Sequence, residues 1–266
     1  MKTKFSGKTI WITGASSGIG RALALMFAGH ETVLILSSRR KDELEKVAGE
    51  CISCGSQAYV FPMDLSNPAD VEATAKLVVS KFDKVDMLIN NGGISQRSFV
   101  LETPVEIDRK VMETDFFSGV ILTKAVLPGM VKNGSGHIVV ISSITGLFGF
   151  PLRSAYAAAK HAMNGFYETL WAELHPSGID VTIVCPGRVN TNVSLNAITS
   201  SGVAHGIMDH DIKKGITPEK CANLILKAIE RKRKIVYIAG KELLMVYFKR
   251  YIPWLFYKLV TKVKPS

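Results

Sequence analysis

The stretch KTIWITGASSGIG, residues 8–20, joins an apolar run to a turn that contains three glycines. The run KTIWIT (8–13) is a candidate for a buried strand, and the chain from Gly18 to Gly29 has the pattern of a helix. Glycines at a strand-to-helix turn let the backbone approach a pyrophosphate, and the N-terminus of the helix supplies free N–H donors. This context predicts dinucleotide binding by the turn residues Gly14, Ser16, Ser17, Gly18, Ile19 and Gly20.

The rest of the chain alternates between short apolar runs and helical patterns. The further strands expected are TVLILS (32–37), QAYVF (57–61), DMLIN (86–90), HIVVIS (137–142), DVTIVC (180–185) and KIVYIA (234–239). This alternation predicts an α/β fold with a single Rossmann-type, doubly wound parallel sheet and helices on both faces. We expect one domain over residues 1–240 with a long irregular loop at 187–216, followed by a short basic and apolar C-terminal tail at 241–266.

The composition is that of an ordinary globular protein, with 266 residues of which 47% are hydrophobic and 21% charged. Four cysteines are too few for a disulfide framework, and the pair Cys51 and Cys54 has neither a second pair nor a nearby histidine. We therefore expect reduced thiols and no metal site. The N-terminal sequence MKTKFSGKTIWITG lacks the long apolar run of a secretory signal, so we expect a cytoplasmic protein.

The net charge of +10 is concentrated near the C-terminus. Residues 231–266 hold ten Lys and Arg and one Glu, which leaves 23 basic and 22 acidic residues for the other 230. The body of the protein is therefore nearly neutral. Because the basic residues of the last segment are interleaved with long aliphatic runs, we expect no nucleic acid partner.

Polar and small residues follow the ends of the later expected strands. The carboxyl ends of parallel strands meet at one edge of the sheet, where ligands of such folds bind. The residues expected to contact a dinucleotide from this edge are Asp64, Leu65, Asn91, Gly92, Pro186, Gly187, Val189 and Thr191.

The second expected strand ends in LSSRR (36–40) and has Ser38 where an acidic residue would accept hydrogen bonds from the ribose of NAD. Arg39 beside it is suited to hold the 2′-phosphate of NADP, whereas Arg40 and Lys41 fit the solvated start of a helix. The sequence therefore favours NADP(H) over NAD(H) as the cofactor.

The segment YAAAK, residues 156–160, places a tyrosine and a lysine four residues apart in a stretch with a helical pattern. Positions four apart share a face of a helix, and a cation on that face favours the phenolate form of a tyrosine. Tyr156 and Lys160 can therefore form a proton-donating pair, although a surface pair on an Ala-rich helix has the same spacing.

These motifs together resemble those of the short-chain dehydrogenase/reductase family over about residues 5–240. The matching elements are TGASSGIG (13–20), NNGG (90–93), Ser143 thirteen residues before Tyr156, and Pro186–Gly187 followed by Thr191. The stretches FPLRSAYAAAKHA and TNVSLNAITSSG are similar to those of the subgroup around dehydrogenase/reductase member seven B. That subgroup is associated with membranes and with lipid-like carbonyl substrates.

The resemblance implies an oxidoreductase in which Tyr156 is the general acid in reduction and the base in oxidation. It implies that Lys160 hydrogen-bonds the nicotinamide ribose and that Ser143 binds the substrate carbonyl oxygen. Thr191 and the backbone after Pro186 would hold the nicotinamide end. Members of the family are often dimers or tetramers, so a homo-dimer or homo-tetramer is expected.

One position departs from the family pattern. The family usually has an asparagine in the helix after NNAG, where it holds a water that links the lysine to solvent. The stretch METDFFSG places Asp115 at that position, and a carboxylate lacks the donor of an amide and brings a charge. We expect Asp115 to act in the proton relay, to be able to pair with Lys160, and to change the pH dependence of the reaction.

The expected substrate is a lipid-like or other apolar ketone that is reduced by NADPH. The loop at 187–216 should cover it, with Val193 and Leu195 among the apolar lining residues. Two alternatives remain open from the sequence: a 3-ketoacyl thioester reductase, and a catalytically weak NADP-binding protein. The presence of Ser143, Tyr156 and Lys160 argues against the second alternative.

The tail KELLMVYFKRYIPWLFYKLVTKVKPS (241–266) is apolar, aromatic and basic at once. Pro253 should interrupt a helix, so two short helical segments are expected. Apolar runs of this length are too short to span a bilayer. Aromatic and basic residues in this combination are typical of contact with an anionic membrane surface, and packing on the body or on another subunit is the alternative.

Overall fold

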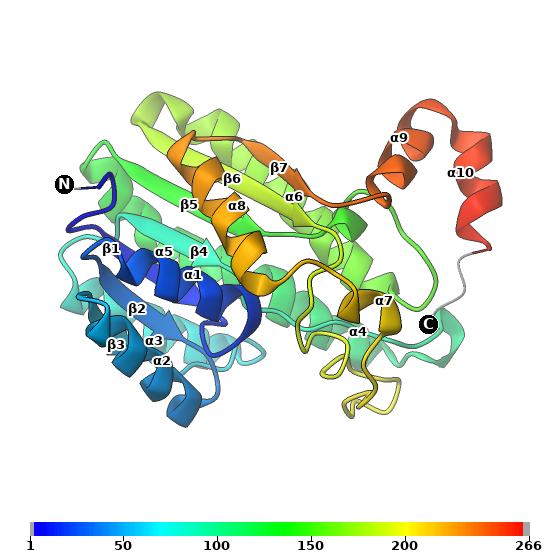
Figure 1. Cartoon of the computed structure of the whole chain (residues 1–266), viewed down its shortest axis with the longest axis horizontal. Helices are drawn as coiled ribbons and strands as arrows, with labels where there is room; N and C mark the ends of the chain where they lie inside the picture. Colours follow the sequence, from blue (N-terminus) through cyan, green and yellow to red (C-terminus); the bar gives the residue numbers. More distant parts are fainter. Residues whose placement is uncertain (1–2, 263–266) are drawn as a thin grey trace.

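In the computed structural model, which describes residues 3–262, seven strands form one parallel sheet in the order β3-β2-β1-β4-β5-β6-β7 (Figure 1). The strands are β1 (Thr9–Thr13), β2 (Val33–Ser37), β3 (Gln57–Val60), β4 (Met87–Asn90), β5 (Gly136–Ile141), β6 (Ile179–Pro186) and β7 (Ile235–Ile238). Each end lies within one residue of the sequence prediction. The strand order reverses between β1 and β4, which confirms the doubly wound sheet and marks the usual ligand-binding crevice.

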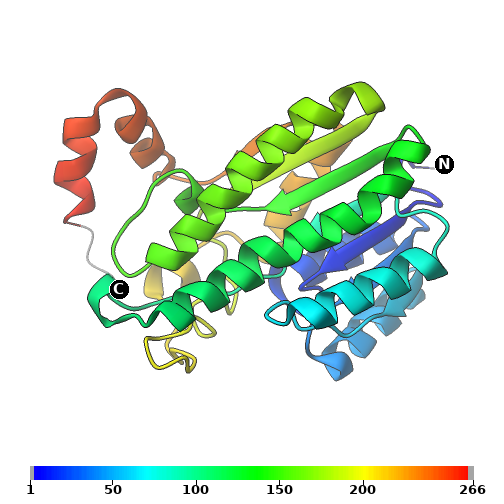
Figure 2. The same ribbon diagram turned by 180° about the vertical axis from the view of Figure 1, so that it is seen from behind.

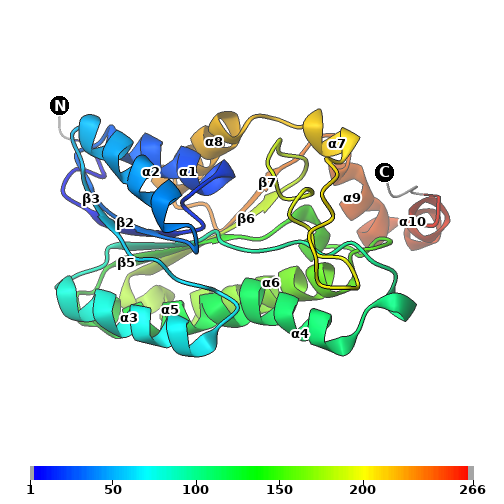
Figure 3. The same ribbon diagram turned by 90° about the horizontal axis from the view of Figure 1, so that it is seen from below.

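Helices cover both faces of the sheet, as predicted (Figure 3). One face carries α1 (Gly18–Ala28), α2 (Lys41–Ser53) and α8 (Pro218–Glu230), and the other carries α3 (Pro68–Lys81), α5 (Ser118–Lys132) and α6 (Ser154–Leu174). Side chains alternate along each strand, so Ile10 and Ile12 pack in the core beneath α1, whereas Trp11 packs in the core of the opposite face. Short helical turns lie in the loops at Val100–Glu102, Ile144–Gly146 and His175–Ser177.

The stretch from 105 to 132 forms one continuous helix on the face seen in Figure 2, made of α4 (Val105–Met112), a π-helical turn η2 (Glu113–Phe117) and α5. Length and composition alone would allow this helix to cross a membrane. In the structure it packs on the sheet through Leu122, Val126 and Met130, as a core helix does. The sequence did not predict the π-helical turn, which contains Asp115, and such turns are frequent at functional sites.

The tail forms the two short helices predicted on either side of Pro253, α9 (Leu243–Tyr251) and α10 (Pro253–Val260). They lie beyond the carboxyl ends of the strands (Figure 1). Phe256 is buried against Ile144 and Phe148 in the segment after β5. Lys249 Nζ donates to the Leu147 carbonyl at 2.7 Å. The predicted tail extends to residue 266, and its last four residues lie outside the described ones.

Candidate active site

A cavity of about 900 Å³ opens at the carboxyl edge of the sheet, next to the reversal between β1 and β4. It is lined by every residue predicted for the cofactor or the reaction except Gly20. Val193 and Ile198, two apolar residues of the loop at 187–216, also line it, but Leu195, predicted for the substrate wall, does not. The loop that carries them also contains the short helix α7 (His210–Lys213).

The glycine turn after β1 lies against the end of β4. Gly14 has a φ of +65°, and a Cβ there would come within 2.7 Å of the Gly92 Cα atom. Thr13 Oγ1 accepts hydrogen bonds from the backbone N–H groups of Asn91, at 3.0 Å, and Gly92, at 2.9 Å. Gly20 is needed for packing, since a side chain there would overlap the Gly14 carbonyl. The turn therefore keeps the bare backbone that close approach of a pyrophosphate requires.

The end of the cavity next to the glycine turn has two arginines. Arg40 Nη2 donates to Ser16 Oγ at 3.0 Å and to Ser17 Oγ at 2.9 Å, so this side chain reaches over the glycine turn. Arg39 also lines the cavity and is exposed. Arg40 is exposed at the start of α2, as predicted, but its guanidinium also reaches the turn, which the sequence did not predict.

Tyr156 and Lys160 lie on one face of α6, with Lys160 Nζ 5.5 Å from the centroid of the tyrosine ring. Lys160 is buried, and its ammonium donates to the Ile141 carbonyl at 3.1 Å. Ser143 follows β5 and lines the same cavity, where its Oγ accepts from the Thr145 N–H at 3.2 Å. A phenol beside a buried cation, facing a serine hydroxyl across a cavity, is an arrangement suited to proton transfer.

Asp115 forms a buried ion pair with Lys160, with 3.2 Å between Oδ2 and Nζ. Its other oxygen, Oδ1, accepts from the Ile94 N–H at 2.7 Å. Burial raises the pKa of the Asp115 carboxyl, and the Lys160 ammonium opposes that shift only in part. Burial alone would lower the pKa of Lys160, but the charges of Asp115 and Tyr156 outweigh it and raise that pKa.

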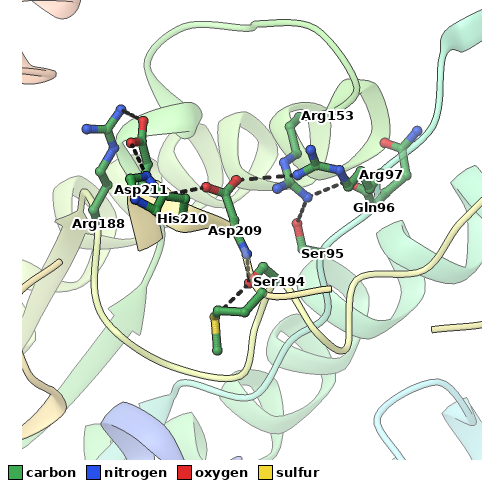
Figure 4. Close-up of polar contacts among 10 residues, drawn as sticks. Ser95, Gln96, Arg97, Arg153, Arg188, Ser194, Asp209, His210 and Asp211 are labelled. Atoms are coloured by element: carbon green, nitrogen blue, oxygen red, sulfur yellow. Dashed lines mark hydrogen bonds and ion pairs between the residues drawn. The ribbon is translucent and has the colours of Figure 1, made fainter. Parts of the chain in front are cut away.

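Sequence reasoning missed a second polar cluster in the cavity, formed by Arg97, Arg153 and Asp209 (Figure 4). Arg153 precedes Tyr156 by one helical turn, a spacing that could have marked it as part of the site. Arg97 and Asp209 are 112 residues apart in the chain, and only the fold brings them together. No sequence pattern signals that pairing.

One wall of the cavity is apolar. Phe148, Phe150 and Leu152 come from the segment between β5 and α6, and Met245 comes from α9 of the tail. The tail therefore forms part of the cavity wall, a contribution that the sequence did not place.

Residues 8–201 match the family model described as short chain dehydrogenase. The chain belongs to the short-chain dehydrogenase family. Among curated relatives, dehydrogenase/reductase SDR family member 7B of Xenopus laevis is 41% identical over 257 residues, covering 94% of this chain and 80% of that protein. The predicted resemblance to the family and to this subgroup is thus confirmed, and the chain is an oxidoreductase of the kind that uses a nicotinamide cofactor.

Solved structures of the family have the same fold but different cofactors. A short-chain dehydrogenase/reductase from Burkholderia phymatum, in complex with NAD, has a TM-score of 0.83 at 25% identity and covers 99% of this chain and 98% of that one. A short-chain dehydrogenase from Sphingobium yanoikuyae, in complex with NADPH, has a TM-score of 0.78 at 26% identity and covers 97% of each chain. The fold therefore leaves open the choice between NAD and NADP.

The variant Asp115→Asn should lower the pKa of Lys160, because the amide carries no charge to offset burial. In the wild type the ammonium persists until the pH exceeds its raised pKa; in the variant it should lose its proton at lower pH. Titration of the Lys160 side chain by NMR in selectively labelled protein measures this.

The matched control is Glu113→Gln, which removes a carboxylate two residues away that does not pair with Lys160. A Lys160 titration that is the same in Asp115→Asn and in the wild type would show that the ion pair does not set this pKa.

Proposed function

We propose that this chain is an NADPH-dependent reductase of an apolar, lipid-like ketone. The observation that carries the proposal is the array of Tyr156, Lys160 and Asp115 in the cavity that also contains the glycine turn. The glycine turn fits a pyrophosphate, since Gly14 and Gly92 leave bare backbone facing the cavity. When bound, NADPH supplies a hydride to the carbonyl carbon.

Tyr156 is the proposed proton donor. Its phenol gives a proton to the carbonyl oxygen as the hydride reaches the carbon, so the ketone becomes an alcohol. Ser143 lines the same cavity and donates a hydrogen bond to that oxygen, which stabilises the charge that develops there. In the reverse direction Tyr156 acts as the base and takes the proton from the alcohol.

Lys160 and Asp115 are proposed to support proton transfer by Tyr156. The Lys160 ammonium is fixed by the Ile141 carbonyl and by Asp115, and it favours the phenolate that Tyr156 becomes after proton transfer. The ammonium is needed for this, so activity should fall when Lys160 loses its proton. We therefore propose that the alkaline limb of the rate profile moves to lower pH in Asp115→Asn, in step with the titration above.

The preference for NADPH is proposed from the two arginines at the adenosine end. Ser38 lines the cavity where NAD-binding members of such folds have an acid, and Arg39 and Arg40 flank it. A guanidinium recognises a phosphate with its forked N–H donors. Arg40 already bonds the hydroxyls of Ser16 and Ser17, which makes it the stronger candidate of the two.

The apolar substrate is proposed from the wall formed by Phe148, Phe150 and Met245. The same wall would suit the acyl chain of a 3-ketoacyl thioester, and no observation favours that alternative.

Two further points stay predictions. They are the division of the chain into a domain at 1–240 and a tail, and the assembly as a homo-dimer or homo-tetramer.

Contact with a membrane surface is proposed from the tail. Tyr251 of α9 and Trp254 and Tyr257 of α10 are 74%, 69% and 64% exposed, while Phe256 of α10 is buried. Lys249, Arg250 and Lys258 accompany them. Exposed aromatic rings with nearby cations suit the headgroup region of an anionic membrane. On this proposal the protein is cytoplasmic and peripheral on the membrane, and its cavity opens beside the lipid.

The decisive test is NADPH consumption with a series of ketones of increasing chain length, run on the wild type and on Tyr156→Phe. Longer ketones should be reduced faster, because their chains make more contacts with the apolar wall of the cavity. Loss of the general acid should lower kcat roughly a thousandfold, with NADPH binding, followed by fluorescence, retained. A variant that turns over ketones as fast as the wild type would remove Tyr156 from the reaction.

The variant Arg40→Gln should raise KM for NADPH about tenfold and change KM for NADH much less, because only NADPH carries the 2′-phosphate. Arg39→Gln, measured in parallel, separates the contributions of the two arginines. The matched control is Arg21→Gln, which removes an exposed arginine of α1 that pairs with Glu50. Equal effects on both cofactors would reject the NADPH preference.

Vesicles of phosphatidylcholine with phosphatidylserine test the tail. Replacing Tyr251, Trp254 and Tyr257 by alanine should lower the vesicle-bound fraction about tenfold, since the exposed aromatic area is lost while the buried Phe256 keeps α10 docked. The control is Val100→Ala with Leu101→Ala, two exposed apolar residues of another loop. Equal co-sedimentation of the tail variant and the wild type would refute the anchor.

A further inference from the structure

Two arginines and one aspartate line the cavity that also contains Tyr156, and they have no part in the reaction proposed above. Figure 4 shows their side chains gathered in one place. Arg97 lies in the segment that follows β4, Arg153 immediately precedes α6, and Asp209 immediately precedes α7. Three separate segments of the chain therefore bring these charges to one place.

The arginines are buried and held in position. Arg153 is 6% exposed, and its Nη1 donates to Ser95 Oγ at 2.8 Å and to the Gln96 carbonyl at 2.6 Å. The side chains of Arg97 and Asp209 are 10% and 12% exposed and form an ion pair at 3.3 Å. Side chains that are already ordered lose little conformational entropy when a ligand binds to them.

Asp209 is fixed from its own side as well. Its Oδ1 accepts from the Asp211 N–H at 3.0 Å, and its own N–H donates to Ser194 Oγ at 3.2 Å. The carboxylate that faces the arginines is thus part of the loop that covers the cavity.

The charges of this cluster do not balance, since two guanidiniums face one carboxylate. Arginine stays protonated in proteins, so the cluster keeps an excess of one positive charge. Burial lowers the pKa of Arg153, and the charges of Tyr156 and Asp209 oppose that shift only in part. The other arginine in this region, Arg188, is half exposed and pairs with Asp211, so it adds no excess.

The excess charge lies close to the reacting atoms. Arg153 precedes Tyr156 by three residues, and the two side chains interact electrostatically in the same cavity. Arg153 also occupies the N-cap position of α6, where the partial positive charge of the helix adds to the attraction for an anion. An anionic group bound here would be only a few bonds away from a carbonyl that receives its proton from Tyr156.

Holding the loop in place explains only part of this arrangement. Arg153 tethers the segment at Ser95 and Gln96, and Arg97 pairs with Asp209 of the covering loop. A tether alone would be more stable if its charges were balanced or its members neutral. The excess positive charge of Arg97 and Arg153 at the cavity would be balanced by an anionic ligand.

We propose that Arg97 and Arg153 bind an anionic group, a carboxylate or a phosphate monoester, that the ketone carries close to its carbonyl. This inference rests on the proposed reductase function and narrows its substrate to an amphiphile: an apolar chain against Phe148 and Met245, and an anion beside the reacting carbon. Arg97 and Arg153 then determine the specificity for anionic over neutral ketones. Asp209 partly neutralises the positive charge that the bound anion contacts.

The test compares charged and neutral probes of equal length. The probes are an α-keto acid of decanoic chain length with its methyl ester, and the phosphate monoester of a hydroxyketone of that length with the free hydroxyketone. The readout is the ratio of kcat/KM for the charged probe to kcat/KM for the neutral one. The wild type should prefer one of the charged probes over its neutral counterpart by about tenfold or more, because a hydrogen bond to a charged group contributes that much to binding. Which charged probe is preferred identifies the anion.

Three variants should change this ratio in different ways. Arg97→Gln should lower it about tenfold, and Asp209→Asn should raise it, because the second change removes the competing carboxylate. Arg188→Gln is the matched control and should leave it unchanged, since that arginine pairs with Asp211. General loosening of the loop would act on both probes of a pair and cancel in the ratio. A ratio near one in the wild type, or an equal ratio in Arg97→Gln, overturns the proposal.

Binding separates this proposal from the reductase function. Decanoate and methyl decanoate have no ketone, and their affinities for the full chain saturated with NADP are measured by calorimetry. If decanoate binds more tightly than methyl decanoate and Arg97→Gln loses this difference, the anion site is supported. If at the same time no ketone is reduced, only the reductase function is rejected. Equal binding of the two, together with active reduction of neutral ketones, sinks the anion site alone.

Discussion

The buried ion pair between Lys160 and Asp115 is the contact on which the arrangement of the site depends. It joins α6 to the π-helical turn of the long helix, and its two members reach further to the Ile141 carbonyl and the Ile94 N–H. The pair therefore holds four segments in one geometry: α6, the π-helical turn, the end of β5 and the loop after β4. Removing two charges from water is costly, so such a pair contributes more to defining positions than to stability.

That geometry explains why the π-helical turn is present. An extra residue in one turn changes which side chains face inward, and here the turn that contains Asp115 directs this carboxylate to the lysine. Tyr156 is positioned by the same helix as Lys160, so an acid, its neighbouring cation and the counterion of that cation are ordered before any ligand binds. Preorganised charge of this kind lowers the cost of reorganisation during a reaction.

The two ends of the cavity differ in chemistry. The end beside the glycine turn offers bare backbone and guanidiniums, which suit phosphates, whereas the other end offers the apolar wall beside the cluster of Arg97, Arg153 and Asp209. An apolar wall and a buried cation together describe an amphiphilic ligand. Met245 of α9 completes this wall, and the exposed aromatic residues lie on α9 and on the adjoining α10, so the proposed contact with lipid and the proposed substrate share one side of the molecule.

The sequence by itself determined the sheet, the glycine turn and the spacing of Tyr156 and Lys160, because these depend on local periodicity, on glycine geometry and on neighbours within one helix. It also indicated two short helices in the tail, since proline acts locally. Only the tertiary structure decided which arginine reaches the glycine turn, that Ile198 lines the cavity while Leu195 does not, and that Arg97 pairs with Asp209. These outcomes depend on how loops distant in sequence pack against one another, and no local pattern of residues encodes that packing.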